Sequence, residues 1–124
     1  MIHPDDIERI MGAVADPKHR TGFDRNLWIW EEYKQENKYL LVADVARGDG
    51  KDYSVFHIIK LETMEVVAEY KGKPNLEMFA QLLFSTANEY GQCLMVVENN
   101  NIGYNVLEKL IEMQYPNLYY SARA

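Results

Sequence analysis

Apolar and polar residues alternate in a regular succession of elements from residue 39 onward. Residues 39–46 form a nearly continuous apolar run, which is typical of a central strand covered on both faces. Residues 53–61 and 65–70 have the composition of two further strands. The links between these three runs are short, at residues 47–51 and 62–63, so we expect an antiparallel meander.

The second half of this region switches between helix and strand periods. Asn75 is a plausible N-cap for a helix that ends at Tyr90, before Gly91. Residues 94–98 predict a strand, and residues 118–122 predict a last strand. Between them, residues 99–103 lead into a predicted helix whose apolar face is formed by Val106, Leu107, Leu110 and Ile111. The predicted order is therefore β-β-β-α-β-α-β, and crossovers through helices place the joined strands parallel.

The first 38 residues are less regular. Apolar residues between 7 and 14 recur at helical spacing, and Pro and Gly between residues 16 and 22 indicate a loop. The large apolar side chains of residues 27–30 are expected to pack on a neighbouring sheet. We expect residues 1–38 to be a connector folded against a domain that begins at residue 39.

Two of the predicted strands end in an acid, Asp44 and Glu98. A carboxylate at the end of an apolar run is costly unless a cation or hydrogen bonds meet it. Acids at the carboxyl ends of neighbouring parallel strands face the crevice where open α/β sheets bind ligands. Oxygen donors without Cys or His favour Mg²⁺ or Mn²⁺ over Zn²⁺. Asp52 is a further candidate ligand, although a turn-forming role explains it equally well.

Length, charge and composition limit the possible fold and function of the chain. The chain has 124 residues, of which 48% are hydrophobic, enough for the core of one domain. The net charge of −6 argues mildly against a free-standing nucleic-acid binder, so we expect little DNA affinity. Met1 and its neighbours lack the pattern of a signal peptide, which makes the cytoplasm the default location. Cys93 is the only cysteine, and a buried place in a strand is its expected role.

Several other residues are weaker candidates. Lys51, Lys71 and Lys73 are candidates for contacts with DNA phosphates near the mouth of the site, although lysines at turns are commonly just solvated. Asn100 belongs to a run of three asparagines that either caps the following helix or presents an amide to a phosphate. His57, inside a strand, is expected to be packed or half-exposed and not to act as a base.

Two segments carry a resemblance to a known family. Residues 44–54 (Asp-Val-Ala-Arg-Gly-Asp-Gly-Lys-Asp-Tyr-Ser) and 96–103 (Val-Val-Glu-Asn-Asn-Asn-Ile-Gly) resemble the nuclease domain of the large terminase subunit of T4-like tailed phages. Residues 26–30 and 115–120 are also similar, so the resemblance spans about residues 22–122. It implies an α/β, ribonuclease H-like fold with a mixed five-stranded sheet in the order 3-2-1-4-5, counted along the predicted strands.

The resemblance also implies a function. Such domains are metal-dependent endonucleases that cut concatemeric double-stranded DNA during genome packaging, holding two divalent metal ions with acidic residues. Asp44 and Glu98 match the first two acids of that set, and Asp52 matches an acid often found in the first loop. The implied partners are an ATPase motor domain, the portal and the small terminase, with no membrane.

The resemblance is incomplete. The family carries a third aspartate in a segment beyond the last matched strand, so residues 39–124 are expected to be a partial nuclease domain whose C-terminal part is missing. We therefore expect the chain alone to bind metal weakly, to cut DNA poorly or not at all, and to self-associate through exposed apolar surface. Two other classes stay open: a fragment of an actin-like or sugar-kinase-like ATPase, which residues 44–48 match poorly, and a non-catalytic interaction module.

Overall fold

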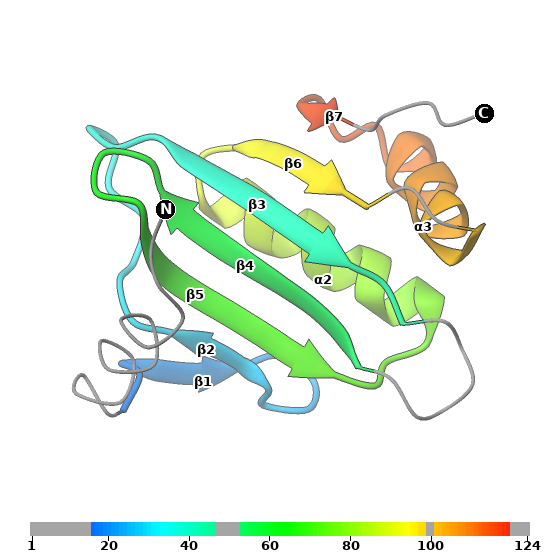
Figure 1. Cartoon of the computed structure of the whole chain (residues 1–124), viewed down its shortest axis with the longest axis horizontal. Coiled ribbons are helices and arrows are strands. Elements are labelled where there is room, and N and C mark those ends of the chain that lie inside the picture. Colours follow the sequence, from blue (N-terminus) through cyan, green and yellow to red (C-terminus); the bar gives the residue numbers. More distant parts are fainter. Residues whose placement is uncertain (1–15, 47–52, 99–100, 120–124) are drawn as a thin grey trace.

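The computed structural model describes residues 16–46, 53–98 and 101–119, and within them the strands form one mixed sheet (Figure 1). Its seven strands lie in the order β1-β2-β5-β4-β3-β6-β7. The strands are β1 (His19–Thr21), β2 (Leu27–Ile29), β3 (Tyr39–Asp44), β4 (Ser54–Lys60), β5 (Glu65–Gly72), β6 (Leu94–Val97) and β7 (Leu118–Tyr119). The helices of the described residues are α2 (Leu76–Glu89) and α3 (Asn101–Glu112).

The five strands expected from the sequence are present and follow the expected order. They correspond to β3, β4, β5, β6 and β7, which lie as β5-β4-β3-β6-β7. The first three pair antiparallel, whereas β6 pairs parallel with both β3 and β7. Short links and helical crossovers produce these directions, as the predicted meander requires.

The expected number of five strands is wrong, because β1 and β2 extend the sheet beyond β5. The loop predicted for residues 16–22 contains β1, whose three residues are all exposed. A short edge strand with two solvated faces has no alternation of apolar and polar residues, so the sequence pattern concealed it. The predicted helix around residues 7–14 lies outside the described residues, and the domain boundary at residue 38 stays a prediction.

The core lies between one face of the sheet and the two helices. In α2, the side chain of Asn75 caps the first turn by accepting a hydrogen bond of 2.8 Å from the Met78 amide, which confirms the predicted N-cap. The helix lies behind the sheet in Figure 1, and α3 packs beside it. The largest fully buried side chains come from both layers and include Leu41, Phe56, Ile58, Tyr70, Phe79, Leu83, Met95, Leu107 and Leu110.

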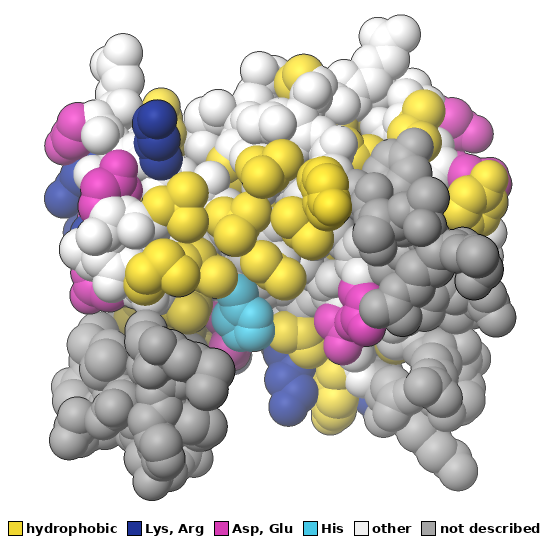
Figure 2. Space-filling view, turned by 45° about the horizontal axis from the view of Figure 1, so that its top comes forward, with side chains coloured by type: hydrophobic (Ala, Val, Ile, Leu, Met, Phe, Trp, Pro, Cys, Tyr) yellow, Lys and Arg dark blue, Asp and Glu magenta, His cyan; other side chains and the backbone are white. Residues whose placement is uncertain are grey.

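No described helix covers the other face of the sheet. In β3, buried residues alternate with exposed or half-buried ones, so the expectation that this strand is covered on both faces is wrong for the described part of the chain. Val42 and Leu94 are exposed on this face, and Ile59 is half-buried. Figure 2 shows hydrophobic side chains gathered on this side around a histidine. We call this surface the open face.

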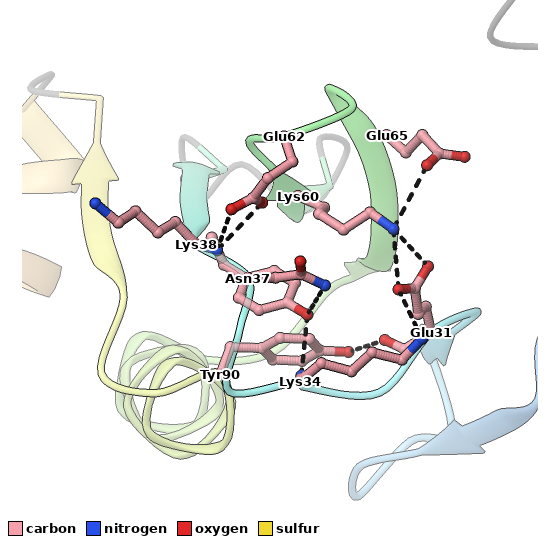
Figure 3. A network of polar contacts seen from close by, with 9 residues as sticks. Glu31, Lys34, Asn37, Lys38, Lys60, Glu62, Glu65 and Tyr90 are labelled. Carbon is pink, nitrogen blue, oxygen red and sulfur yellow. Dashed lines mark hydrogen bonds and ion pairs between the residues drawn. The ribbon is translucent and has the colours of Figure 1, made fainter.

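The segment that precedes β3 is fixed to the sheet by polar contacts at the end where β3 begins (Figure 3). The Lys60 ammonium contacts both carboxylate oxygens of Glu31, at 3.0 and 3.2 Å. This contact raises the pKa of Lys60. The Tyr90 hydroxyl donates to the Glu31 carbonyl at 2.6 Å, and the Tyr39 hydroxyl accepts from the Lys34 amide at 3.0 Å. This network therefore lies at the start of β3, and Asp44 lies at the other end of the strand.

Candidate metal site

The structure places Asp44 and Glu98 side by side at the carboxyl ends of two adjacent parallel strands. Asp44 is the last residue of β3, and Glu98 directly follows β6. The pairing of Ala43 with Val97 puts the two acids at the next matched position. The Glu98 amide donates to the Ala43 carbonyl at 3.0 Å, which holds the backbone of Glu98 in this register.

Both acids lie on the open face. Side chains alternate between the faces of a strand, so Asp44 shares a face with Val42, and Glu98 shares the same face with Val96. Both acids are exposed, and their strands lie about 4.8 Å apart. Two carboxylates at that spacing reach a common cation, and their oxygen donors suit a hard divalent ion such as Mg²⁺ or Mn²⁺.

The backbone beneath the acids is well supported. Ala43 and Val97 are each 1% exposed and point into the core from the positions just before the acids. Val45, just after Asp44, is also buried. The site thus stands on two strands whose neighbouring residues are held by packing, and its carboxylates can meet a ligand with little movement of the main chain.

Ser54 supports the chain next to the acids, a role that was not predicted from the sequence. Its side-chain oxygen accepts a hydrogen bond of 3.0 Å from the Ala46 amide, which joins the chain after β3 to the start of β4. Ser54 is only 3% exposed. A serine at the first position of an apolar strand is the sequence signal that would have indicated such an inward contact.

The described residues bring two of the three predicted acids together. Asp52, Lys51 and Asn100 lie outside the described residues. Within the described ranges, no group of three or more His, Cys, Asp or Glu side chains is placed to hold a metal ion. Of the predicted lysines, Lys71 and Lys73 lie near the carboxylate end of the sheet, where each places its ammonium over the ring of Tyr53.

A cleft lies away from the two acids. A cleft of ≈ 730 Å³ is bounded by β1, the C-terminal end of α2 and the segment between β2 and β3. Lys18 and Arg25 line it together with Glu32 and Glu89. The cleft lies at the end of β3 opposite Asp44, so its residues are not part of the metal site. Its lining carries both positive and negative side chains, which do not favour a ligand of one charge.

Comparison with solved structures identifies the fold. The magnesium-bound large terminase nuclease of thermophilic phage G20c superposes with a TM-score of 0.70 over 88% of this chain, at 21% identity. Its zinc-bound form gives 0.69 over 85% of the chain at 23% identity, and the nuclease domain of Thermus phage P74-26 large terminase gives 0.66 over 86% at 20% identity. The chain has the fold of a large terminase nuclease. No protein-family model and no curated protein matches it.

The predicted resemblance to large terminase nucleases and the predicted ribonuclease H-like fold are thereby confirmed at the level of the fold, whereas a special likeness to T4-like phages stays a prediction. The chain spans about half the length of these nucleases, from 52% to 58% of the three superposed chains. Within the described residues, neither helix is long and apolar enough to cross a membrane.

Proposed function

We propose that this chain is the metal-binding part of an endonuclease domain of a phage DNA-packaging terminase. The observation that carries the proposal is the placement of Asp44 and Glu98 at matched positions on adjacent parallel strands of a terminase nuclease fold. Neither the fold nor the acid pair suffices alone, because a fold hosts many functions and acids often end strands. Their coincidence at the ligand-binding edge of the sheet supports a nuclease site.

In this proposal, Asp44 and Glu98 hold divalent metal, and Asp52 is a further ligand. The G20c nuclease has been solved with magnesium, cobalt and zinc, so its fold accepts divalent ions. Mg²⁺ or Mn²⁺ suits the carboxylates of this chain best. Two such ions, when bound, activate the attacking water and stabilise the leaving oxygen of a phosphodiester. The two carboxylates orient that chemistry at the rim of the sheet, and no nucleophilic side chain is required.

The proposed substrate is double-stranded DNA, as the concatemer that packaging divides. Lys51, Lys71, Lys73 and Asn100 are proposed to contact its phosphates, which would position the duplex without reading its sequence. An ATPase motor domain, the portal and the small terminase are the proposed partners of the complete protein, in the cytoplasm of the host cell.

We expect this chain alone to bind metal weakly and to cut DNA poorly or not at all, since the described residues bring only two acids together. A plasmid-cleavage assay in Mn²⁺ tests this expectation. Robust cleavage that disappears in Asp44→Asn would show that the chain is a complete nuclease and would overturn the expected inactivity.

The metal site itself is tested by paramagnetic broadening of amide resonances. Substoichiometric Mn²⁺ should broaden the amides around Asp44 and Glu98 first, and Asp44→Asn should remove that effect. Broadening around the Glu31 and Glu65 carboxylates, with residues 43–45 and 97–98 unchanged, would refute the proposed site. Stabilisation by a nucleotide without any Mn²⁺ dependence would favour the ATPase class.

A further inference from the structure

Tyr53, Lys71 and Lys73 form a cluster beside the acid pair, which we call the lysine–tyrosine cluster. The Lys71 ammonium lies 4.8 Å from the centre of the Tyr53 ring, and the Lys73 ammonium lies 4.9 Å from it. Tyr53 is 49% exposed, and both lysines are exposed. One ring therefore gathers two positive charges at the surface of a chain whose net charge is −6.

The cluster shares a face and an edge with the acids. Asp44 pairs with Val55, and Val55 pairs with Lys71, so the three lie in one row across β3, β4 and β5. Lys71 is thus two strand spacings from Asp44, a backbone distance of about 10 Å. Ser54 pairs with Gly72, and Tyr53 and Lys73 are the next residues beyond that pair along the two chain segments.

This spacing matches the path of a nucleic-acid strand. One strand of duplex DNA rises 3.4 Å per nucleotide along the axis while it winds around that axis, so its successive phosphates are about 7 Å apart and about 10 Å corresponds to one or two nucleotides. A strand whose phosphate lies at Asp44 and Glu98 has another phosphate within reach of Lys71. Lysines gain affinity there because neutralising phosphates releases condensed counterions.

We propose that the lysine–tyrosine cluster is a phosphate clamp that holds the cleaved strand of duplex DNA about one or two nucleotides from the metal site. Lys71 and Lys73 contact the phosphates, and Tyr53 is a positioning residue that keeps the two ammonium groups together despite their like charge. The inference rests on the proposed nuclease function and adds the direction of the strand, which runs from β6 across β3 and β4 toward β5.

Duplex binding without metal tests the clamp separately from the metal site. A labelled duplex is titrated in EDTA at several salt concentrations with the full chain and with the double variant Lys71→Met, Lys73→Met. The matched control is Lys18→Met, Lys38→Met, which removes the same charge from two exposed lysines away from the acid pair. Circular dichroism checks that each variant is folded.

We expect the cluster variant to lose about tenfold in affinity at low salt and to lower the slope of log affinity against log salt by about 1.8. The control should lose much less, and Tyr53→Leu should fall between the two. Equal losses in the cluster and control variants, or no measurable duplex binding by the unmodified chain at low salt, would overturn the clamp.

A second readout uses the unmodified chain. Duplex DNA should protect Lys71 and Lys73 from acetylation, measured by mass spectrometry, and should leave Lys18 and Lys38 reactive. The reverse pattern would contradict the clamp. A clamp that passes both tests while Mn²⁺ fails to bind at Asp44 would leave a DNA-binding surface and refute the nuclease function alone.

Discussion

Replacing Tyr70 by Phe removes one hydroxyl that joins the β1–β2 hairpin to the rest of the sheet. Tyr70 is fully buried on β5, its ring stacks on Phe56 at 5.5 Å, and its hydroxyl donates to the Asp24 carboxylate at 2.7 Å. Burial raises the pKa of Tyr70, and the bond to Asp24 adds to this effect. The hydroxyl therefore stays neutral and acts as a donor at ordinary pH.

The size of the effect follows from these contacts. A hydrogen bond to a charged group contributes about 1.5 to 3 kcal/mol, and the half-buried position of Asp24 favours the lower end because water can replace the lost donor. The Asp24 carboxylate also accepts a hydrogen bond of 3.1 Å from the Asn26 amide, which Tyr70→Phe leaves in place. We expect Tyr70→Phe to cost about 1.5 kcal/mol. For 124 residues the unfolding entropy is about 0.26 kcal/mol/K, so the melting temperature should fall by about 6 °C.

Urea unfolding followed by circular dichroism measures this loss. Tyr104→Phe is the matched control, because Tyr104 is 55% exposed and the chemical change is the same. A double-mutant cycle with Asp24→Ala should give a coupling energy of about 1 kcal/mol or more. Equal costs for the two Tyr→Phe variants, or a coupling energy near zero, would refute the view that this bond ties residues 16–38 into the same cooperative unit as the sheet.

Three further outcomes follow from other features of the structure. Gly72→Ala should destabilise the fold at least as much as Tyr70→Phe, because the new Cβ would collide with the Tyr70 hydroxyl; unchanged urea unfolding would contradict this. Burial raises the pKa of the Cys93 thiol to about 11, above its ordinary value of 9.0, so the thiol should resist a disulfide reagent at pH 8. The protonated Cys93 thiol should contribute fully to the free energy of unfolding below about pH 9, and this contribution should be lost as the pH rises toward 11. In alkaline unfolding curves, Cys93→Ala should therefore reduce the loss of stability over this pH range. The open face should drive concentration-dependent association, which Val42→Lys should weaken in light scattering, whereas Leu94→Ile should preserve it; a clean monomer with no apolar dye binding would count against this.

The central sheet was predictable because each of its strands carries a strong local signal. The apolar runs that end at Asp44 and Glu98 indicated both the strands and the edge where the acids meet, since parallel strands bring their carboxyl ends together. The cap at Asn75 was equally local, because its side chain bonds to an amide only three residues away.

The remaining features depend on contacts between distant residues. β1 has no alternation to reveal it, and the Tyr70 hydroxyl meets Asp24 across 46 residues of sequence. The gathering of Lys71 and Lys73 around Tyr53 needs the β4–β5 register, which spacing along the chain does not specify. The open face departed from expectation because a strand can be strongly apolar and still have only one side packed.

Calorimetric titration with Mn²⁺ tests directly whether Asp44 and Glu98 together hold a divalent metal. We expect weak but measurable binding to the unmodified chain, and loss of that binding in both Asp44→Asn and Glu98→Gln. Glu108→Gln, an exposed acid on α3, should bind as the unmodified chain does. Binding that survives in both site variants, or that Glu108→Gln removes equally, would show that Asp44 and Glu98 do not hold the metal.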